Sequence, residues 1–453
     1  MSVHVENDIT ISRYEDLFVP FTSSEKPETE FRCGAEMEKF GVTAGGAVLP
    51  FDGPTSVRTV MKSLEDGYGW VPESEVKDGP VLALLRNGAS ITLEPGSQFE
   101  LSGAPMLQSH EICTEFRNHL SEIRPVSERL GITWLGLGFH PFSKRADYTF
   151  VPKQRYGIMR SYLPTRGSLA LDMMLRTSTV QGNYDYTGEK DAMRKLRVGL
   201  RLSAVTTAMF ANSPFYEGKP FGGKSFRAKV WVNMDPDRSG LVPTCWSENA
   251  TYRDYIEWAL SAPMFMFKRG DEMRVNTGQT FRSFFADGFK GEKPIMSDWL
   301  THLNTLFPEV RLKKTIEVRG ADSQGAATAC ALPALYLGIY YDEKALAEAE
   351  ALTQDFTHDE VEASRQHVWD KGLSAPFRGK TLLPLAQRLL EIAEGGLERR
   401  AFKSSKGNDE RVHLARIKTL LAKGQSPADA LLENLPDGDL TEEIIRRSNL
   451  HHQ

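Results

Sequence analysis

The sequence predicts an α+β fold in which a mainly antiparallel sheet is combined with helices. Two observations carry this prediction. Short runs in which apolar and polar residues alternate recur through the first three quarters of the chain, and from about Lys344 onward the apolar spacing becomes helical. With 453 residues, 40% of them hydrophobic and 25% charged, the chain can bury a sizeable core in one large or two medium domains.

Four segments are expected to form strands, each with its polar side chains on one face. In residues 91–101 the pair Pro95-Gly96 predicts a turn, and Glu94 lies just before it. The shared polar positions are Glu36 and Glu38 in 31–41, Gln98 and Glu100 in 91–101, Thr179, Gln181, Asn183 and Asp185 in 171–186, and Glu317 and Arg319 in 314–320. Any one such strand is explained by an ordinary solvent-facing sheet. Recurrence of glutamate with little lysine to balance it favours a functional face instead.

Helices are expected at residues 111–129, 190–210 and 251–260, and through most of the chain after Lys344. Because alternating runs give way to helical spacing after Lys344, we predict a catalytic sheet domain with helices over residues 1–343. Residues 344–453 are predicted to form a helical part packed on the same domain.

The repeated glutamates predict a cation site if the strands converge. Two close carboxylates repel each other by about 1 kcal/mol in water and about 4 kcal/mol at the dielectric of a protein surface. Either some of them protonate or metal ions neutralise them. Hard oxygen ligands without paired cysteine or histidine select Mg²⁺, Mn²⁺ or Ca²⁺, and Mg²⁺ commonly binds together with phosphates such as those of ATP. Arg319, among the acids, could then bind phosphate or carboxylate oxygens.

Composition and charge exclude several other functions. Lys and Arg total 55 against 60 Asp and Glu, a net charge of -5 that gives no basic excess for nucleic acid. No stretch approaches the roughly 18 apolar residues of a membrane helix. Residues 1–30 are polar and acidic, so we expect neither a signal nor a transit peptide. The 4 cysteines lie far apart, which argues against a zinc knuckle, an iron-sulfur site or a disulfide scaffold and predicts a cytoplasmic protein.

Two local motifs have weaker interpretations. Residues 218–225, GKPFGGKS, match the phosphate-loop pattern GxxxxGK[ST], but a true phosphate loop follows a buried strand and opens a helix. Here the following residues, FRAKVWV, alternate like a strand, so we interpret the motif as a glycine-rich connection. His110 lies close to Cys113, but no second pair completes a metal site, and a structural role is expected.

Several long segments together resemble the plant and proteobacterial type of glutamate-cysteine ligase. They are FRCGAEMEKFGV, ITLEPGSQFELSGAP, WLGLGFHPF, RYGIMRSYLPTRGSLALDMMLRTSTVQGNYDY, FANSPFYEGKP, HLNTLFPEVRLKKTIEVRGAD and GLERRAF, in family order from about residue 30 to about residue 430. The resemblance implies a glutamine-synthetase-like fold, in which a curved, mainly antiparallel sheet has a polar inner face and helices packed outside.

The resemblance also implies roles for individual residues. Glu36, Glu38, Glu94, Glu100 and Glu317 are expected as metal ligands, Arg319 and Arg227 as catalytic residues, and Gln98, Gln181, Asn183 and Thr179 as substrate-binding residues. Gln181 stands where more distant members have a metal-binding histidine. The absence of a plant-like transit peptide favours a bacterial enzyme.

The implied reaction joins the γ-carboxylate of L-glutamate to the amine of L-cysteine through γ-glutamyl phosphate, the first step of glutathione synthesis. ATP is the expected co-substrate and Mg²⁺, with Mn²⁺ as the alternative, the expected cofactor, in a monomer or homodimer without nucleic acid or membrane partners. Two alternatives stay open. One is a related ligase that joins glutamate to a different amine, and the other is a non-catalytic metal-binding protein.

Overall fold

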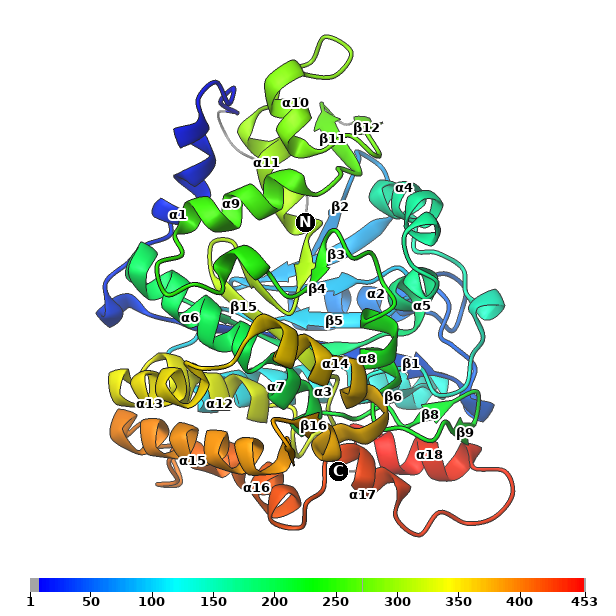
Figure 1. The fold of residues 1–453 in the computed structure, drawn as a ribbon. Helices are drawn as coiled ribbons and strands as arrows, with labels where there is room; N and C mark the ends of the chain where they lie inside the picture. Colours follow the sequence, from blue (N-terminus) through cyan, green and yellow to red (C-terminus); the bar gives the residue numbers. More distant parts are fainter. Residues whose placement is uncertain (1–7, 271, 452–453) are drawn as a thin grey trace.

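A computed structural model describes residues 8–270 and 272–451, which are organised around one nine-stranded sheet (Figure 1). Its path runs β14-β15-β7-β1-β5-β4-β3-β2, with β6 paired to β1, and every neighbouring pair is antiparallel. Because the path begins at β14 and ends at β2, the sheet is open. Its strands are β1 (Cys33–Val42), β2 (Val71–Ser74), β3 (Val81–Arg86), β4 (Ala89–Leu93), β5 (Phe99–Ser102), β6 (Thr133–Leu135), β7 (Thr179–Tyr184), β14 (Val310–Leu312) and β15 (Ile316–Asp322).

The central strand β1 follows the predicted alternation. Cys33, Ala35 and Met37 are buried on one face, whereas Glu36 and Glu38 are half-buried on the other. A period of two therefore divides the strand into a core side and a polar side.

Helices cover the apolar side of the sheet. The packed elements are α3 (Ser109–Leu130) against β1, α7 (Ser203–Met209) against β15, and α12 (Ala331–Tyr340) against β7. All ten residues of α12 are buried because α15 (Leu383–Arg400) covers its other side. The two helices approach so closely that a Cβ at Gly396 would collide with the carbonyl oxygen of Gly338.

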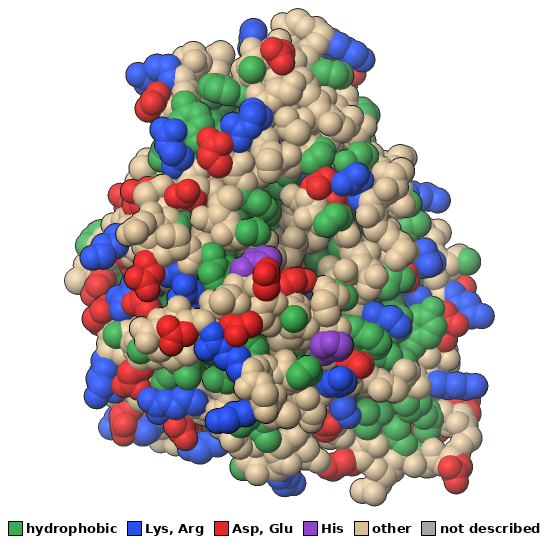
Figure 2. All heavy atoms as spheres, viewed as in Figure 1, with side chains coloured by type: hydrophobic (Ala, Val, Ile, Leu, Met, Phe, Trp, Pro, Cys, Tyr) green, Lys and Arg blue, Asp and Glu red, His purple; other side chains and the backbone are tan. Residues whose placement is uncertain are grey.

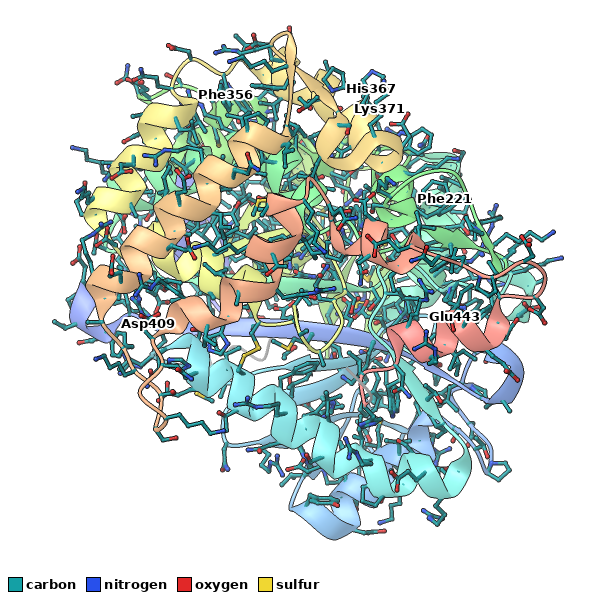
Figure 3. The ribbon with its side chains drawn as sticks, turned by 90° about the horizontal axis from the view of Figure 1, so that it is seen from below. Phe221, Phe356, His367, Lys371, Asp409 and Glu443 are labelled. Atoms are coloured by element: carbon teal, nitrogen blue, oxygen red, sulfur yellow. A yellow bond between two sulfur atoms is a disulfide. The ribbon has the colours of Figure 1, made fainter. Side chains whose placement is uncertain are left out.

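The last quarter of the chain is helical, as predicted. It contains α13 (Glu343–Thr353), α14 (His358–Lys371), α15, the 3₁₀ helix η8 (Glu410–Leu414), α16 (Ala415–Ala422), α17 (Pro427–Leu432) and α18 (Thr441–Ser448). Figure 3 shows these segments from below, with Asp409 just before η8 and Glu443 in α18. The largest hydrophobic cluster contains buried side chains from Ile11 to Leu450, and two smaller clusters include Phe40 and Phe139. The division at residues 343 and 344 falls where α13 begins and stays a prediction.

Three expected helices are confirmed, and two expected strand segments are wrong. Residues 111–129 lie in α3, residues 190–210 form α6 (Glu189–Arg201) and α7, and residues 251–260 lie in α9 (Tyr252–Ser261). The first part of 171–186 is instead helix α5 (Ala170–Arg176), and FRAKVWV forms α8 (Phe226–Trp231). The hydroxyl of Ser225 accepts the amide of Ala228 and caps α8, while Phe226 and Val230, four residues apart, pack on Phe139.

The surface carries both signs of charge. On the face shown in Figure 2, Lys and Arg side chains are interspersed with Asp and Glu. Within the described residues no helix combines the length and the apolar character needed to cross a membrane.

Candidate active site

The polar face of the sheet brings the predicted glutamates together from separate stretches of chain. Glu38 on β1 lies directly opposite Glu100 on β5, and Glu36 lies between Ser102 of β5 and Gln181 of β7. Directly opposed Cβ atoms in antiparallel strands are about 4.5–5.5 Å apart. The next strand, β15, places Glu317 opposite Asn183 of β7 in the same way.

Within the part of the chain that the structure describes, the hydrogen-bond donors to four of these carboxylates are all uncharged. Glu36 accepts Asn183 Nδ2 at 3.1 Å, and Glu38 accepts the amide of Thr179 at 3.0 Å. The partners of the other two are Thr92 Oγ1 (2.6 Å) and Ser102 Oγ (2.8 Å) on Glu100, and Tyr156 Oη (3.5 Å) on Glu94. Across residues 8–270 and 272–451, none of the four forms an ion pair with Lys or Arg.

The electrostatics of this acidic half oppose ionisation. Burial, followed by the charges of Glu317 and Glu100, raises the pKa of Glu36 to about 7. Burial and the charges of Glu94 and Glu100 hold the pKa of Glu38 well above its ordinary value, and burial with Glu100 also raises the pKa of Glu94. A divalent cation among these oxygens would favour their ionised forms and so offset all three shifts. The donor set, oxygen without thiolate or imidazole, fits Mg²⁺.

The fifth predicted metal ligand, Glu317, has a different environment. Its Oε2 and Oε1 accept Arg311 Nε at 2.5 Å and Nη2 at 3.0 Å, and Arg319 Nη1 lies 3.1 Å from Oε2. Burial alone would raise the pKa of Glu317, but Arg311, Lys313 and Arg319 outweigh burial and lower it. Because two arginines already neutralise this carboxylate, a metal ion could bind it only by sharing or displacing them.

The two predicted arginines lie beside each other. Arg319 Nη1 donates to Gln181 Oε1 at 2.7 Å, and Arg227 Nη2 donates to the carbonyl of Arg319 at 2.9 Å. Both line a small cavity of about 20 Å³ together with Arg365. Arg365 is already paired with Glu309, which lines the same cavity, and with Glu362. Arg319 and Arg227 are therefore the guanidinium groups suited to bind an anionic group here.

Asp322, at the end of β15, positions the helix that carries Arg227. Its Oδ2 accepts Ser213 Oγ at 2.6 Å and its Oδ1 accepts Ser225 Oγ at 2.8 Å. Ser225 is the N-cap of α8, so the carboxylate fixes the start of the helix that carries Arg227.

The predicted substrate-binding residues differ in what their side chains contact. Gln181 and Asn183 lie on the polar face, where Asn183 also accepts Thr315 Oγ1 at 3.0 Å. Thr179 donates its hydroxyl to the carbonyl of Ala321 at 2.6 Å, which ties β7 to β15.

Gln98 uses its amide on the backbone rather than on the polar face. Its Oε1 accepts the amide of Gly96 at 2.8 Å, and its Nε2 donates to the carbonyls of Met174 and Thr177 at 3.1 and 2.9 Å. The structure therefore assigns Gln98 to holding the turn between β4 and β5, in place of the substrate contact expected from sequence.

Sequence reasoning missed Arg311, Lys313 and Thr92. Arg311 and Lys313 were detectable, because residues 310–313, VRLK, continue the alternation that identified Glu317. Burial, followed by the charge of Arg311, lowers the pKa of Lys313 to about 8. No sequence pattern identified Thr92, because its role depends on lying opposite Glu100 in the pairing of β4 with β5.

The glycine-rich segment 218–225 is not arranged as a phosphate loop, although it does lead into a helix. It follows the two-residue strand β8 (Phe215–Tyr216) and contains β9 (Lys219–Pro220). Lys224 Nζ forms an ion pair with Asp429 at 2.7 Å, in the C-terminal helical part.

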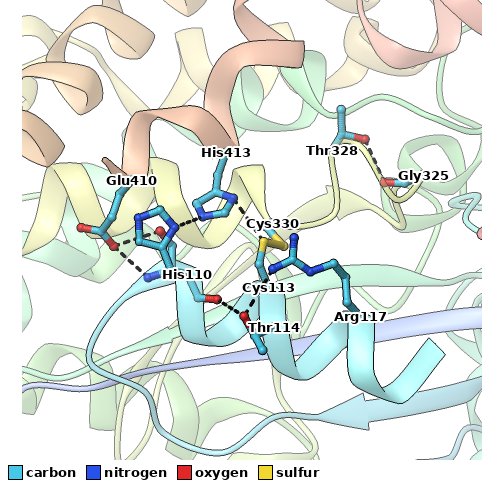
Figure 4. Close-up of a disulfide and its surroundings, with 10 residues drawn as sticks. His110, Cys113, Thr114, Arg117, Gly325, Thr328, Cys330, Glu410 and His413 are labelled. Atoms are coloured by element: carbon cyan, nitrogen blue, oxygen red, sulfur yellow. Dashed lines mark hydrogen bonds between the residues drawn. A yellow bond between two sulfur atoms is a disulfide. The ribbon is translucent and has the colours of Figure 1, made fainter. Parts of the chain in front are cut away.

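The spacing of the cysteines argued against a disulfide scaffold, but two of the four are paired. Cys113 on α3 and Cys330 at the N-cap of α12 form a disulfide (Figure 4). They lie 217 residues apart in sequence, so spacing along the chain could not indicate the pair. Cys33 and Cys245 are free and buried.

Comparison with known proteins gives consistent similarities. Residues 32–449 match the model of glutamate-cysteine ligase family 2. Over 422 residues, 92% of this chain and 83% of the relative, the sequence is 40% identical to chloroplastic glutamate-cysteine ligase B of Oryza sativa subsp. japonica. It is 41% identical over 423 residues to the chloroplastic enzyme of Medicago truncatula, covering 92% of this chain and 81% of that one.

A solved structure, glutamate-cysteine ligase of Francisella tularensis in complex with AMP, has a similar fold. The TM-score is 0.55 with 11% sequence identity, and the match covers 92% of this chain and 87% of the other. The likeness confirms the expected glutamine-synthetase-like fold with its large antiparallel sheet.

The expected cytoplasmic location is contradicted by the same comparisons. The relatives from Oryza sativa, Medicago truncatula and Arabidopsis thaliana are chloroplastic proteins. The acidic N-terminal residues and the spacing of the cysteines, on which that expectation rested, do not report on the compartment of this family.

Proposed function

We propose, because the chain belongs to glutamate-cysteine ligase family 2, that it joins the γ-carboxylate of L-glutamate to the amine of L-cysteine using ATP. This reaction is the first step of glutathione synthesis. The observation that carries the proposal at the site is the group of four carboxylates that have no cationic partner among the described residues, close to Arg319 and Arg227. The polar face thus has an acidic region on β1 and β5 that suits divalent cations, and a region around Arg319 on β15 that suits anions.

The proposed metal ligands are Glu36, Glu38, Glu94 and Glu100, with Glu317 shared between a metal ion and its arginines. Bound Mg²⁺ would supply positive charge for the phosphate oxygens of ATP. The neutral donors Thr92, Ser102 and Asn183 hold the carboxylates in place, which is the usual task of groups behind metal ligands.

The chemistry requires activation of a carboxylate, since a carboxylate is a poor electrophile toward an amine. Transfer of the γ-phosphoryl group of ATP to glutamate gives γ-glutamyl phosphate. The cysteine amine then attacks its carbonyl carbon, phosphate leaves, and the amine proton passes to a base. Arg319 and Arg227 lie where they could bind the transferring phosphoryl group or the substrate carboxylates, so that most of the rate gain comes from positioning and electrostatics.

The decisive experiment is mass spectrometry of the product formed from glutamate, cysteine, ATP and Mg²⁺. We expect γ-glutamylcysteine and stoichiometric ADP, and we expect neither when a chelator removes the metal. Comparing ADP release with cysteine, serine, alanine and 2-aminobutyrate tests the alternative of a different amine. Protein that binds Mg²⁺ but releases no ADP with any amine would instead support a non-catalytic metal-binding role.

Removal of one acidic charge should disable the site without unfolding the protein. We expect Glu38→Gln and Glu317→Gln each to lower kcat about 100-fold or more, in line with loss of one preorganised electrostatic group. Glu115→Gln is the matched control, since this half-buried glutamate also has a pKa raised by burial but lies on α3. Near-normal turnover of either site variant, with circular dichroism unchanged, would contradict its proposed role.

A further inference from the structure

A second group of metal-ligating side chains lies away from the polar face of the sheet. Cys113 on α3, Cys330 at the start of α12 and His413 in η8 each offer one ligand atom, and these atoms lie within 4.8 Å of one another. In Figure 4 the imidazole of His413 is directed at the disulfide. Its Nδ1 lies 3.2 Å from the Sγ of Cys113.

A second histidine orients the first. The Nε2 of His413 lies 2.9 Å from the Nδ1 of His110, a hydrogen bond between the two rings. In the tautomer with the proton on Nε2, His413 donates this bond and keeps the Nδ1 lone pair directed at the sulfur. Metal-binding histidines commonly use their other ring nitrogen to donate in this way, which fixes the ring and its tautomer.

We propose that the reduced form of this cluster is a Zn²⁺ site, with Cys113, Cys330 and His413 as its three protein ligands. A dithiol reduces the disulfide by transferring two electrons and two protons, and becomes a disulfide itself. Zn²⁺ then binds both sulfurs and releases the two thiol protons. Two thiolates and a neutral imidazole select zinc over Mg²⁺, so the site is chemically distinct from the acidic face.

The geometry is close to what zinc requires. With Zn–S of about 2.3 Å and Zn–N of about 2.1 Å, a tetrahedral centre separates S from N by about 3.6 Å and S from S by about 3.8 Å. The Nδ1 to Sγ distance is already 3.2 Å, and the Cα atoms of the cysteines are 5.8 Å apart. Once the covalent bond is broken, side-chain rotation is enough to separate the sulfurs.

Charge and access favour the same occupant. Both cysteines are buried, and Zn²⁺ with two thiolates has no net charge, which lowers the free-energy cost of placing an ion there. A surface cavity of about 880 Å³ reaches the cluster at His413, and it is also lined by His110, residues 403–406 and Asn408. This cavity gives metal ions and reductants a path to His413, and we assign the fourth position of the metal to water.

The test measures zinc bound by the full-length protein in two redox states. Protein reduced with a phosphine, which leaves no competing thiol, and protein left oxidised are each incubated with Zn²⁺ in excess Mg²⁺ to occupy the acidic face. After desalting we expect one zinc per chain in the reduced form and background in the oxidised form. Replacing zinc by Co²⁺ should give a thiolate-to-cobalt charge-transfer band in the reduced form only.

Variants decide whether the named residues bind the metal. Cys113→Ser, Cys330→Ser and His413→Ala should each weaken zinc binding more than tenfold. His110→Ala, which removes the orienting partner, should weaken it about 10- to 100-fold. Cys245→Ser, a free buried cysteine outside the cluster, is the control and should bind zinc as the parent does.

Two results would overturn the proposal. One is equal zinc content in the reduced and oxidised proteins, and the other is tight binding that survives Cys330→Ser. Alkylation of the reduced parent protein provides a check that needs no substitution, because it must abolish zinc binding in a chain that still has native circular dichroism.

Discussion

At the scale of single residues, partners rather than residue type decide how the glutamates of the polar face behave. Glu317 and Glu36 lie on the same face, one strand apart from each other. Arg311 and Arg319 surround Glu317 and lower its pKa, whereas burial without a cation raises the pKa of Glu36 to about 7. The unpaired carboxylates are therefore the ones that favour metal ions.

Substitution of two basic residues, Arg319 and Lys224, tests whether the proposed anion site or the glycine-rich motif binds the phosphates of ATP. We expect Arg319→Ala to lower kcat about 100-fold or more, because it removes a cation directed at the polar face. Lys224→Ala should change kcat less than about threefold and stability by less than about 1 kcal/mol, since it breaks only a part-exposed ion pair with Asp429. Steady-state kinetics with ATP varied measure both, and the reverse ranking would restore the phosphate-loop interpretation.

A buried histidine remote from the polar face should make stability depend on pH. Burial lowers the pKa of His302 to about 3, while its Nε2 hydrogen-bonds the carbonyl of Ala259 at 2.8 Å. The unfolded chain, with a histidine pKa of about 6.5, binds the proton first as the pH falls. The stability contributed by neutral His302 is therefore present above about pH 6.5 and is lost toward pH 3.

The expected size of this effect is about 2 kcal/mol of unfolding free energy between about pH 7.5 and about pH 5. Urea denaturation at both pH values measures the free energy of unfolding. Its decrease from about pH 7.5 to about pH 5 should be smaller in His302→Phe than in the parent by about 2 kcal/mol. His367→Phe, at an exposed position on α14, is the matched control and should keep the parent's pH dependence. An equal pH dependence in parent and His302→Phe would contradict the assignment.

At the scale of elements, the turn between β4 and β5 is locked onto the connection from α5 to β7. Gln98 holds the carbonyls of Met174 and Thr177, and a Cβ at Gly96 would collide with the carbonyl oxygen of Leu175. This close approach fixes the position of Glu100 relative to β7, which lies on the far side of β1.

Substitution of that glycine tests the importance of the contact. We expect Gly96→Ala to lower the free energy of unfolding by about 1–3 kcal/mol, the usual range for overpacking. Gly157→Ala is the control, because position 157 lies within α4 (Gln154–Tyr162) with nothing within 4 Å of an added Cβ. It should be neutral or stabilise by about 0.4–1 kcal/mol. Equal effects of the two changes in urea denaturation would mean that the turn is not tightly held.

At the scale of the whole molecule, one disulfide joins helix α3, early in the chain, to the start of helix α12, which comes much later in the sequence. Cys113 lies in α3 against β1, and Cys330 begins α12 against β7, so the bond links two helices that cover neighbouring strands. Such a link across 217 residues restricts the unfolded chain strongly.

Reduction should therefore destabilise the folded protein. We expect the free energy of unfolding to fall by about 2–5 kcal/mol when the bond is reduced by a phosphine, with a chelator present to exclude metal. The doubly substituted Cys113→Ser/Cys330→Ser protein is the control and should be insensitive to reductant. Identical urea midpoints for oxidised and reduced parent protein would show that the bond adds no stability.

The sequence by itself determined which side chains share the polar face, because alternation along a strand is a local property of the backbone. It also determined the helical end of the chain and, through its resemblance to a known family, the fold. It missed the helices α5 and α8, because both are too short for helical spacing to be distinguished from alternation. Packing on Phe139 favoured the helical conformation of α8.

Only the tertiary structure decided which distant residues became partners. The pairing of Glu38 with Glu100, the two arginines on Glu317, the turn-holding role of Gln98 and the contact of His413 with Cys113 all join segments brought together by folding. Their separations along the chain range from a few residues to 300, and hydrogen bonds and charge interactions act through space. A side chain's type is written in the sequence, but its pKa and its ligand depend on neighbours that the fold supplies.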